Sequence, residues 1–495
     1  MLEPAYQADV VIVGAGVAGL SAAHRLTSAG VRTVVLEAAP YVGGRMSTEK
    51  VDGFRLDRIG RLLSTAYPEL RLIPGLDALT LRPFAPGVLV HADGRTHRAG
   101  EPGSTASTGG ARGALGAARA FVTAPRRPRA TRRSGQSPDG AARQSGPSPD
   151  RTARRSGPSP DGAAHRASAP PAGAQPLPRT FPPLGGAIDQ ARLSAALGRI
   201  AAAPVERLLA RPDRPAGHAL AARGMPARTV EGFLRPLLAA LLCDPDLTTS
   251  SRSADLALRA FAAGGLCIPE GGADTLPELL AAALPPGTVH TGVHVTSVST
   301  TSVRTAEHGE LRCRAVLVAT GARAAAELLP GLRVPPFHPV TVVHHTPDEV
   351  PQAGAGLLLD ADRRGPVAHT AVLSEVDPSR APAGRALVSS TILGPPPPDA
   401  DRVVRAHLAD LYGTSTLRWE LLAVHHTPDA VPAMPPPHDL RRPVRLLDGL
   451  YVCGDHRDTS TVQGALHSGH RAATALLTDL GVGSANTAAP LPRAA

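Results

Sequence analysis

The chain has 495 residues and a formal charge of +10, but residues 101–180 hold 13 arginines against one glutamate and three aspartates, so the rest is nearly neutral. A basic charge confined to one segment gives no reason to assign nucleic-acid binding to the folded part. The four cysteines include no Cys-x-x-Cys pair, which argues against a zinc site or a redox dithiol. The sequence has no run of 18 apolar residues and no signal-peptide pattern, which argues against a membrane span and against export. We therefore expect a cytoplasmic protein.

The first hundred residues alternate strand, turn and helix signals. The β-branched run Val10–Val13 predicts a parallel strand buried on both faces, and Val31–Leu36 predicts a second one. Between them lie a G-x-G-x-x-G turn at 14–19 and helical spacing over Leu20–Leu26. Further on, Pro86–Arg98 has the pattern of a β-hairpin with an Asp-Gly turn.

The glycine turn indicates a dinucleotide site. Gly14 permits the tight turn, Gly16 lets the backbone approach a pyrophosphate, and Gly19 lets helix and strand pack closely. The helix N-terminus offers free N–H groups and about half a positive charge to the anion. Glu37 ends the second strand 23 residues after Gly14, where a carboxylate is placed to accept both ribose hydroxyls of an adenosine.

The composition changes between residues 101 and 179. From 134 to 166 an eleven-residue unit runs three times, as SGQSPDGAARQ, SGPSPDRTARR and SGPSPDGAAHR. The unit contains no aromatic residue, valine, leucine or isoleucine, so it has nothing to bury against its ordering entropy. Each copy also carries Ser-Pro and glycine, which stop helices. We therefore expect a disordered basic insertion rather than a folded repeat.

Regular patterns return near residue 185. Residues 187–285 have Ala/Leu faces interrupted by proline and glycine, which predicts several helices. Later strands are expected at Val289–Val298, Cys313–Thr320, Pro339–His345, Val367–Ser374 and Leu450–Cys453, and later helices at Asp401–Tyr412 and Val462–Leu480.

The segment after Glu37 distinguishes FAD from NAD as the expected ligand. It reads Glu-x5-Gly-Gly-Arg and ends in Gly43, Gly44 and Arg45. This pattern resembles the signature of the large flavoprotein family that includes amine oxidases, protoporphyrinogen oxidases and phytoene desaturases, and the chain is most similar to a carotenoid-desaturase-like branch. The resemblance covers about 1–98 and 185–480, and its further motifs lie at 53–57, 65–69, 233–236, 247–252 and 451–455. The chain departs from the family just after Asp57, where Arg-Ile-Gly stands in place of an early glycine.

The resemblance implies an α/β fold with a Rossmann-like FAD-binding domain assembled from separated segments, an α+β substrate domain and the long disordered insertion. The expected divisions are 1–100, 264–335 and 438–483 for the FAD-binding domain, 180–263 and 336–437 for the substrate domain, 101–179 for the insertion and 484–495 for a flexible tail.

The resemblance also implies which residues hold FAD. Because no cysteine lies between Cys313 and Cys453, we expect FAD to bind without a covalent bond. Arg45 would supply a fixed fork of donors beside the cofactor. Asp455 would hold the ribityl chain, and the backbone of Val293 would bracket the adenine. The helix that starts at Val462 and Gln463 would aim its N-terminus at the pyrimidine edge of the flavin. The full expected set is Gly14, Gly16, Gly19, Glu37, Gly43, Gly44, Arg45, Val293, Gly454, Asp455, Val462 and Gln463.

No catalytic residue follows from the sequence, but two histidines are candidates for substrate contact. His456 and His467 lie near the expected flavin edge. The pairs at 344–345 and 425–426 are adjacent in strands and face opposite ways, so we expect no metal site.

The expected reaction moves a hydride between the flavin and a small apolar substrate, as in desaturases and isomerases. Amine oxidation in this family usually needs a lysine near the flavin and an aromatic cage, whereas the chain has one lysine, Lys50, and a threonine at the place of the cage tyrosine. Two alternatives stay open. One is a flavin amine oxidase or protoporphyrinogen-oxidase-like enzyme, and the other is a flavin-binding protein with a degenerate active site acting in a complex. Peripheral contact with a membrane is also left open, and no nucleic-acid partner is expected.

Overall fold

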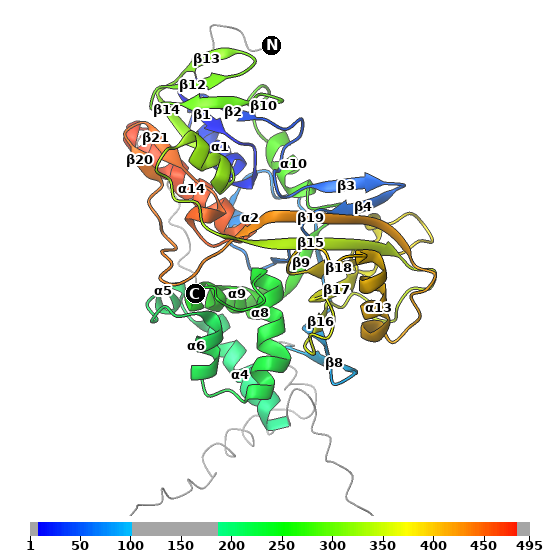
Figure 1. The fold of residues 1–495 in the computed structure, drawn as a ribbon. Helices are drawn as coiled ribbons and strands as arrows, with labels where there is room; N and C mark the ends of the chain where they lie inside the picture. Colours follow the sequence, from blue (N-terminus) through cyan, green and yellow to red (C-terminus); the bar gives the residue numbers. More distant parts are fainter. Residues whose placement is uncertain (1–7, 101–186, 483–495) are drawn as a thin grey trace, which may run out of the picture. The chain divides into compact units, whose positions relative to one another are not determined.

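A computed structural model of the chain describes residues 8–100 and 187–482. The expected insertion at 101–179 and tail at 484–495 lie outside the described residues. The described part contains a central parallel sheet, a second larger sheet and a group of helices (Figure 1).

The central sheet has six strands in the order β10-β2-β1-β14-β21-β20, and every neighbouring pair is parallel except β21 with β20. The strands are β1 (Val10–Val13), β2 (Thr33–Glu37), β10 (Val289–Thr291), β14 (Ala315–Val318), β20 (Arg445–Leu447) and β21 (Leu450–Val452). Three well-separated parts of the sequence thus supply one sheet. This confirms the predicted Rossmann-like α/β fold assembled from separated segments.

Apolar side chains cover both faces of this sheet, which explains why its strands read as unbroken apolar runs. Val10 and Ile12 face a core made with α1, α10 and α14. Val11 and Val13 face a core made with α11 and the three-stranded sheet β11-β12-β13. These surrounding elements are α1 (Val17–Ser28), α10 (Thr275–Ala282), α11 (Ala322–Leu328), α14 (Val462–Asp479), β11 (Val295–Val298), β12 (Ser302–Thr305) and β13 (Gly309–Arg312).

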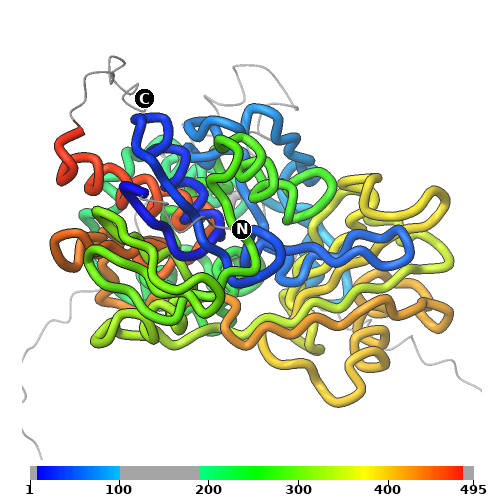
Figure 2. The backbone as a smooth tube through the Cα atoms, turned by 90° about the horizontal axis from the view of Figure 1, so that it is seen from above, coloured from blue at the N-terminus to red at the C-terminus, as the bar shows by residue number. Residues whose placement is uncertain are grey.

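Helices α1 and α14 lie side by side although they stand at opposite ends of the described chain (Figures 1 and 2). The Ser21 hydroxyl of α1 donates a hydrogen bond to the Leu466 carbonyl of α14 at 2.9 Å. Gly469 of α14 sits so close to α1 that a Cβ there would collide with the Ala18 carbonyl. This close packing fixes the C-terminal helix against the helix that follows the glycine turn.

The second sheet has seven strands in the order β19-β15-β18-β17-β16-β7-β8. They are β7 (Val88–Ala92), β8 (Arg95–Ala99), β15 (Phe337–Thr346), β16 (Leu358–Asp360), β17 (His369–Val372), β18 (Val388–Ile392) and β19 (Glu420–Pro432). Strands β7 and β8 form the predicted hairpin, with Asp93 and Gly94 both at positive φ in its turn. Helix α13 (Ala400–Tyr412), also as predicted, packs its apolar face on this sheet.

The helices predicted between 187 and 285 form a group that packs beside the hairpin. A continuous core joins Val88 and Val90 of β7 to Phe233, Leu237 and other residues of this group. Its helices are α4 (Ala187–Ala202), α5 (Val205–Leu209), α6 (Ala216–Ala222), α7 (Ala227–Thr229), the π-helix η2 (Val230–Leu234), α8 (Arg235–Leu242) and α9 (Ser251–Gly264).

Shorter elements connect these parts. They are α2 (Glu69–Leu72), α12 (Leu373–Val376), η3 (Pro378–Arg380), η4 (Asp455–Arg457), the pair β3 (Thr48–Val51) and β4 (Phe54–Asp57), and the small sheet of β5 (Leu63–Ser64), β6 (Leu81–Pro83) and β9 (Leu266–Pro269).

Several predicted strands were wrong in extent. The stretch 289–298 is two strands in different sheets, because Gly292 adopts a left-handed conformation (φ +72°) that turns the chain between them. The strand predicted at 367–374 ends at Val372, where helix α12 begins. The strand β14 also starts two residues later than predicted, at Ala315.

Candidate functional site

The carboxyl ends of four parallel strands meet at one cavity. Gly14 follows β1, Glu37 ends β2, Ala319 follows β14 and Gly454 follows β21, and all four line a cavity of about 550 Å³. Open α/β sheets bind ligands outside the carboxyl ends of their strands. The volume also lies within the usual range for ligand cavities. The cavity therefore has the position and the size of a cofactor site.

The glycine turn has the geometry that a dinucleotide requires. Gly14 has φ +105°, and a Cβ there would lie 3.1 Å from the backbone of Ala319. A Cβ on Gly19 would collide with the Gly14 carbonyl, whereas nothing lies within 4 Å of a Cβ built on Gly16. Gly16 and Val17 thus present the open N-terminus of α1 to the cavity. This arrangement fits a pyrophosphate, which needs backbone N–H groups and close approach.

The Glu37 carboxylate is held in place at the cavity wall. Its Oε2 accepts a hydrogen bond from the Ala15 N–H at 2.7 Å, and its Oε1 accepts one from the Ala39 N–H at 2.9 Å. An ionised carboxylate has about four acceptor sites, so two remain. These two free acceptor sites match the two hydrogen-bond donors of a pair of vicinal hydroxyls.

Gly43 and Gly44 lie against the glycine turn. The Gly43 N–H donates to the Ala15 carbonyl at 2.9 Å, and Gly16 and Gly43 form an isolated parallel bridge. Both glycines have positive φ, at +110° and +58°. A side chain at either position would be strained, so the backbone itself forms this part of the wall.

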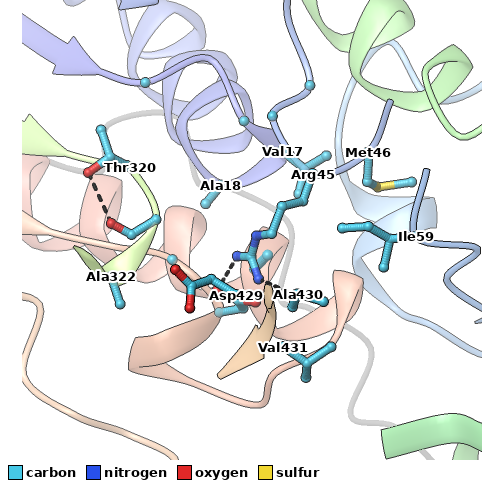
Figure 3. A pocket seen from close by; sticks show the side chains of 18 of the residues that line it. Val17, Ala18, Arg45, Met46, Ile59, Thr320, Ala322, Asp429, Ala430 and Val431 are labelled. Atoms are coloured by element: carbon cyan, nitrogen blue, oxygen red, sulfur yellow. Dashed lines mark hydrogen bonds and ion pairs between the residues drawn. The ribbon is translucent and has the colours of Figure 1, made fainter. Parts of the chain in front are cut away.

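Arg45 and Asp455 are paired with each other inside the cavity. Arg45 Nη2 donates to Asp455 Oδ1 at 2.6 Å, and Nη1 donates to the Ala430 carbonyl at 2.9 Å. Figure 3 shows the Arg45 side chain reaching across the cavity toward Asp429 and Ala430. Burial acts to raise the pKa of Asp455, but the Arg45 guanidinium outweighs it and holds that pKa below its ordinary value. Asp455 is therefore an ionised acceptor at neutral pH.

The N-terminus of α14 also opens on the cavity. The Thr461 hydroxyl accepts a hydrogen bond from the Gly464 N–H at 3.0 Å and caps the helix. Thr461 and Val462 line the cavity. Gln463 does not, and its side-chain oxygen instead accepts a hydrogen bond from the Glu69 N–H at 3.1 Å.

Val293 lies away from the cavity lining. It sits in the turn between β10 and β11, and its N–H donates to the Glu37 carbonyl at 2.9 Å. The backbone of Val293 is thus next to the residue predicted to bind ribose, without itself reaching the cavity.

Neither candidate histidine lines the cavity. His456 is buried, and neither of its ring nitrogens has a hydrogen-bond partner among the described residues. Burial lowers the pKa of His456 to about 4, so its ring is neutral at pH 7. His467 Nδ1 lies 3.0 Å from Asp458 Oδ2, and this hydrogen bond raises the pKa of His467 above its ordinary value. The structure therefore places neither candidate histidine in the cavity lining.

Sequence reasoning missed Arg61, which reaches the cavity from the segment after β4. Its Nη1 lies 2.9 Å from the Cys243 sulfur, and its Nη2 donates to the Ser460 carbonyl at 2.7 Å. No local pattern marks this residue, because its partners are about 180 and 400 residues away in sequence. The departure from the family pattern after Asp57 is the one signal that could have drawn attention to it.

Arg323, Phe337 and Asp429 were also missed. Arg323 and Asp429 form an ion pair, with Nη2 and Oδ1 2.9 Å apart. The Arg323 guanidinium lies over the Phe337 ring at 5.2 Å from its centre. All three residues line the cavity and join α11 to β15 and β19.

The cavity lining offers few groups for proton transfer. Among the described residues, the lining contains no lysine, histidine or cysteine, and Phe337 is its one aromatic side chain. Lys50 lies on β3 and is exposed. No cluster of metal-ligating side chains occurs within 8–100 and 187–482, and no helix there is long and apolar enough to cross a membrane.

Three comparisons relate the chain to known proteins. The family model for flavin-containing amine oxidoreductases matches residues 17–477. Putrescine oxidase from Kocuria rosea is 42% identical over 98 residues, which are 19% of this chain and 20% of that protein. Carotenoid 3,4-desaturase from Haloarcula japonica is 51% identical over 49 residues, 10% of each chain. The matched region is therefore about a fifth of these relatives or less. The structure of a putrescine oxidase bound to putrescine aligns with a TM-score of 0.61 at 17% identity, over 96% of this chain and 99% of that one.

Proposed function

The chain belongs to the flavin-containing amine oxidoreductase family and is an FAD-dependent oxidoreductase, and from this premise we propose that it holds FAD non-covalently and moves a hydride between the flavin and a small apolar substrate. The flavin supplies the redox chemistry when bound, and the protein supplies binding, orientation and a dry cavity.

The donor set of the cavity supports FAD. The N-terminus of α1 faces the position expected for the pyrophosphate, and the Glu37 carboxylate has free capacity for the ribose hydroxyls. The N-terminus of α14, an 18-residue helix, adds a positive dipole end that would favour negative charge on a reduced ring.

The absence of an attachment residue in the lining supports non-covalent binding. No cysteine or histidine lines the cavity within the described residues. Cys453, the cysteine next in sequence to Gly454, is buried in the sheet core, and burial raises its pKa to about 12. A thiol in that state is a poor nucleophile.

The single observation that carries the substrate proposal is the apolar character of the cavity beyond the glycine turns. Ile59, Ala430 and Val431 line it and belong to one buried apolar cluster. A desaturase- or isomerase-like hydride transfer needs little acid–base help, which agrees with a lining that has no lysine or histidine.

The same lining disfavours amine oxidation. Two carboxylates of the lining are already paired, Asp455 with Arg45 and Asp429 with Arg323. The Arg61 guanidinium has no carboxylate partner among the described residues of the lining and would repel a protonated amine. One aromatic side chain, Phe337, cannot form a cage around a substrate nitrogen.

Two measurements test the proposal. Acid precipitation of the yellow protein should release FAD into the supernatant, and pigment that stays in the pellet would contradict non-covalent binding. Anaerobic incubation with panels of polyprenoid and amine substrates should bleach the flavin only with polyprenoids. Bleaching by amines would overturn the substrate class. A flavin that dithionite reduces but no panel member does would favour a flavin-binding protein with a degenerate active site.

A further inference from the structure

A second large cavity lies entirely within the helical group. It has a volume of about 830 Å³ and is open to solvent along helices α4, α5, α6 and α9 (the green helices of Figure 1). It shares no lining residue with the cofactor cavity. A ligand held here would therefore be separate from the flavin. We refer to this cavity as the helical groove.

The floor of the helical groove is apolar. Leu193 and Leu197 of α4 and Leu258 of α9 are buried at its base, and Ile200 and Met225 extend the apolar surface. None of the described residues that line the groove is aromatic. Saturated hydrocarbon suits such a floor, whereas nucleic-acid bases would find no stacking partner.

The rim of the groove is strongly cationic. Arg199, Arg207 and Arg214 line it, and their side chains are not engaged in any hydrogen bond or ion pair with the described residues. Arg211 and Arg223 also line it, and both bind the carboxylate of Asp255. The groove lining thus holds five guanidinium groups and one carboxylate. That carboxylate, of Asp255, is only 1% exposed and is already paired with both Arg211 and Arg223.

The neighbouring carboxylates do not cancel this charge. Asp213 is engaged elsewhere, because its Oδ1 accepts from the Ser250 hydroxyl at 2.6 Å and its Oδ2 from the His438 N–H at 2.9 Å. Glu206 is exposed on α5 and does not line the groove.

We propose that the helical groove binds a monomeric amphiphilic anion, a single-chain carboxylate whose tail lies on the leucine floor and whose headgroup lies among Arg199, Arg207 and Arg214. Guanidinium groups bind carboxylates through paired, charge-assisted hydrogen bonds. The chain's own basic segment is a poor occupant by charge, since residues 101–180 carry 13 arginines against four acidic residues. This inference does not depend on the substrate of the flavin site.

The test uses the full-length, flavin-loaded protein and dodecanoate below its micellar concentration. Calorimetric titration should give saturable binding of dodecanoate, weaker binding of octanoate, and no comparable binding of dodecyltrimethylammonium. The R199Q/R207Q/R214Q variant should lose binding by about 10- to 100-fold, as expected for the loss of charge-assisted hydrogen bonds. Flavin content and thermal midpoint should stay as in the wild type, because these exposed side chains make no hydrogen bond or ion pair with the described residues.

The matched control is R95Q/R304Q/R312Q, which removes the same charge from three exposed arginines outside the groove. It should bind dodecanoate as the wild type does. Equal losses in the two variants would mean that net charge, and not the groove, governs binding. Equal affinity for dodecanoate and dodecyltrimethylammonium would overturn the proposal. So would retention on anionic vesicles without binding of monomeric dodecanoate, because that result would assign the groove to a membrane surface.

Discussion

Glu37 combines two tasks at one side chain. Its carboxylate holds the backbone of Ala15 and Ala39 in the shape of the turn, and its remaining acceptor sites face the cavity. Arg45 and Asp455 are likewise bound to each other as well as exposed to the cavity. Each of these residues therefore shapes the site before any ligand arrives.

This dual task gives the first prediction. Glu37→Ala and Arg45→Ala should each weaken FAD retention by about 10- to 100-fold, because a buried charge-assisted hydrogen bond is worth ~1.5–3 kcal/mol. FAD occupancy after gel filtration and titration of the flavin-free protein measure the effect. Asp139→Ala, in the repeat segment, is the control and should retain FAD fully. Equal occupancy in all three variants would remove Glu37 and Arg45 from the site.

Buried neutral histidines give a second prediction, on pH. Burial lowers the pKa of His369 from its ordinary value of 6.5 to about 4. The unfolded chain then binds a proton that the folded chain does not, so stability is complete above pH 6.5 and falls as the pH drops toward 4. For His369 the loss is on the order of 1–3 kcal/mol.

His369→Gln should therefore reduce the drop in thermal midpoint between pH 7 and pH 4.5. Some drop should remain, because burial also lowers the pKa of His344 to about 3 and that of His470 to about 4. His308→Gln, at an exposed position, should leave the drop unchanged. A drop in His369→Gln as steep as in the wild type would show that His369 does not contribute.

At this scale, the residues that could be predicted are those whose role is indicated by a local sequence pattern. Gly14, Gly16 and Glu37 follow from spacing within one strand-turn-helix-strand unit, and the structure brings all three to the cavity. The partner of Asp429 is 106 residues away and that of Arg61 is 399 residues away, so no local window of sequence contains their signal. The assignment of the whole set to FAD stays a prediction until variants are measured.

At the scale of elements, the packing of α14 on α1 positions the two helix N-termini that open on the cavity. Gly469 makes this packing possible, since a Cβ there would collide with the backbone of α1. The sequence predicted both helices, because each has a clear apolar period. It did not predict their contact, because neither helix has a local sequence pattern that identifies the other as its packing partner. In the same way Gly292, a single left-handed residue, divided a strand that the apolar pattern had joined.

Gly469→Ala should lower the thermal midpoint and the flavin content together. Overpacking of this kind costs ~1–3 kcal/mol, which exceeds the gain of up to ~1 kcal/mol in helix propensity. Gly198→Ala on α4 is the matched control, because nothing lies within 4 Å of its Cβ. That variant should be as stable as the wild type or slightly more so. An unchanged Gly469→Ala protein would mean that α14 is free to shift away from α1.

At the scale of the whole molecule, one chain builds the nucleotide-binding sheet from three well-separated stretches. The resemblance to the flavoprotein family implied this assembly, and the structure confirms it. The division of the chain into cofactor and substrate domains stays a prediction, as does the disorder of 101–179.

Deleting residues 105–178 should leave folding and flavin binding nearly unchanged. Both ends of the deletion fall outside the described elements, between β8 and α4. Shortening the connection about sevenfold changes its closure free energy by only ~2 kcal/mol, in the favourable direction. The deletion variant should show wild-type flavin content and thermal midpoint.

Trypsin provides an independent readout on the intact chain. It should cut first at Arg132 and Arg133 or at Arg154 and Arg155 while FAD stays bound. Loss of the flavin on deletion, or resistance of these sites in the native protein, would mean that the segment is folded or docked.

The order of the strands in the central sheet also determines when the sheet can be completed during translation. Strand β1 needs β14 as its neighbour, and β14 needs β21, which follows β1 by more than 400 residues. At about 5–20 residues per second, the ribosome completes β21 about 20 to 90 s after β1. Until β14 is complete, about 300 residues and about 15 to 60 s after β1, Val10–Val13 is an apolar strand with an unpaired edge. From then until β21 is complete the unpaired edge belongs to β14, and in both states the free edge is a binding site for a holding chaperone. Flavin can be loaded only after translation has passed β21, so prematurely terminated products should contain none.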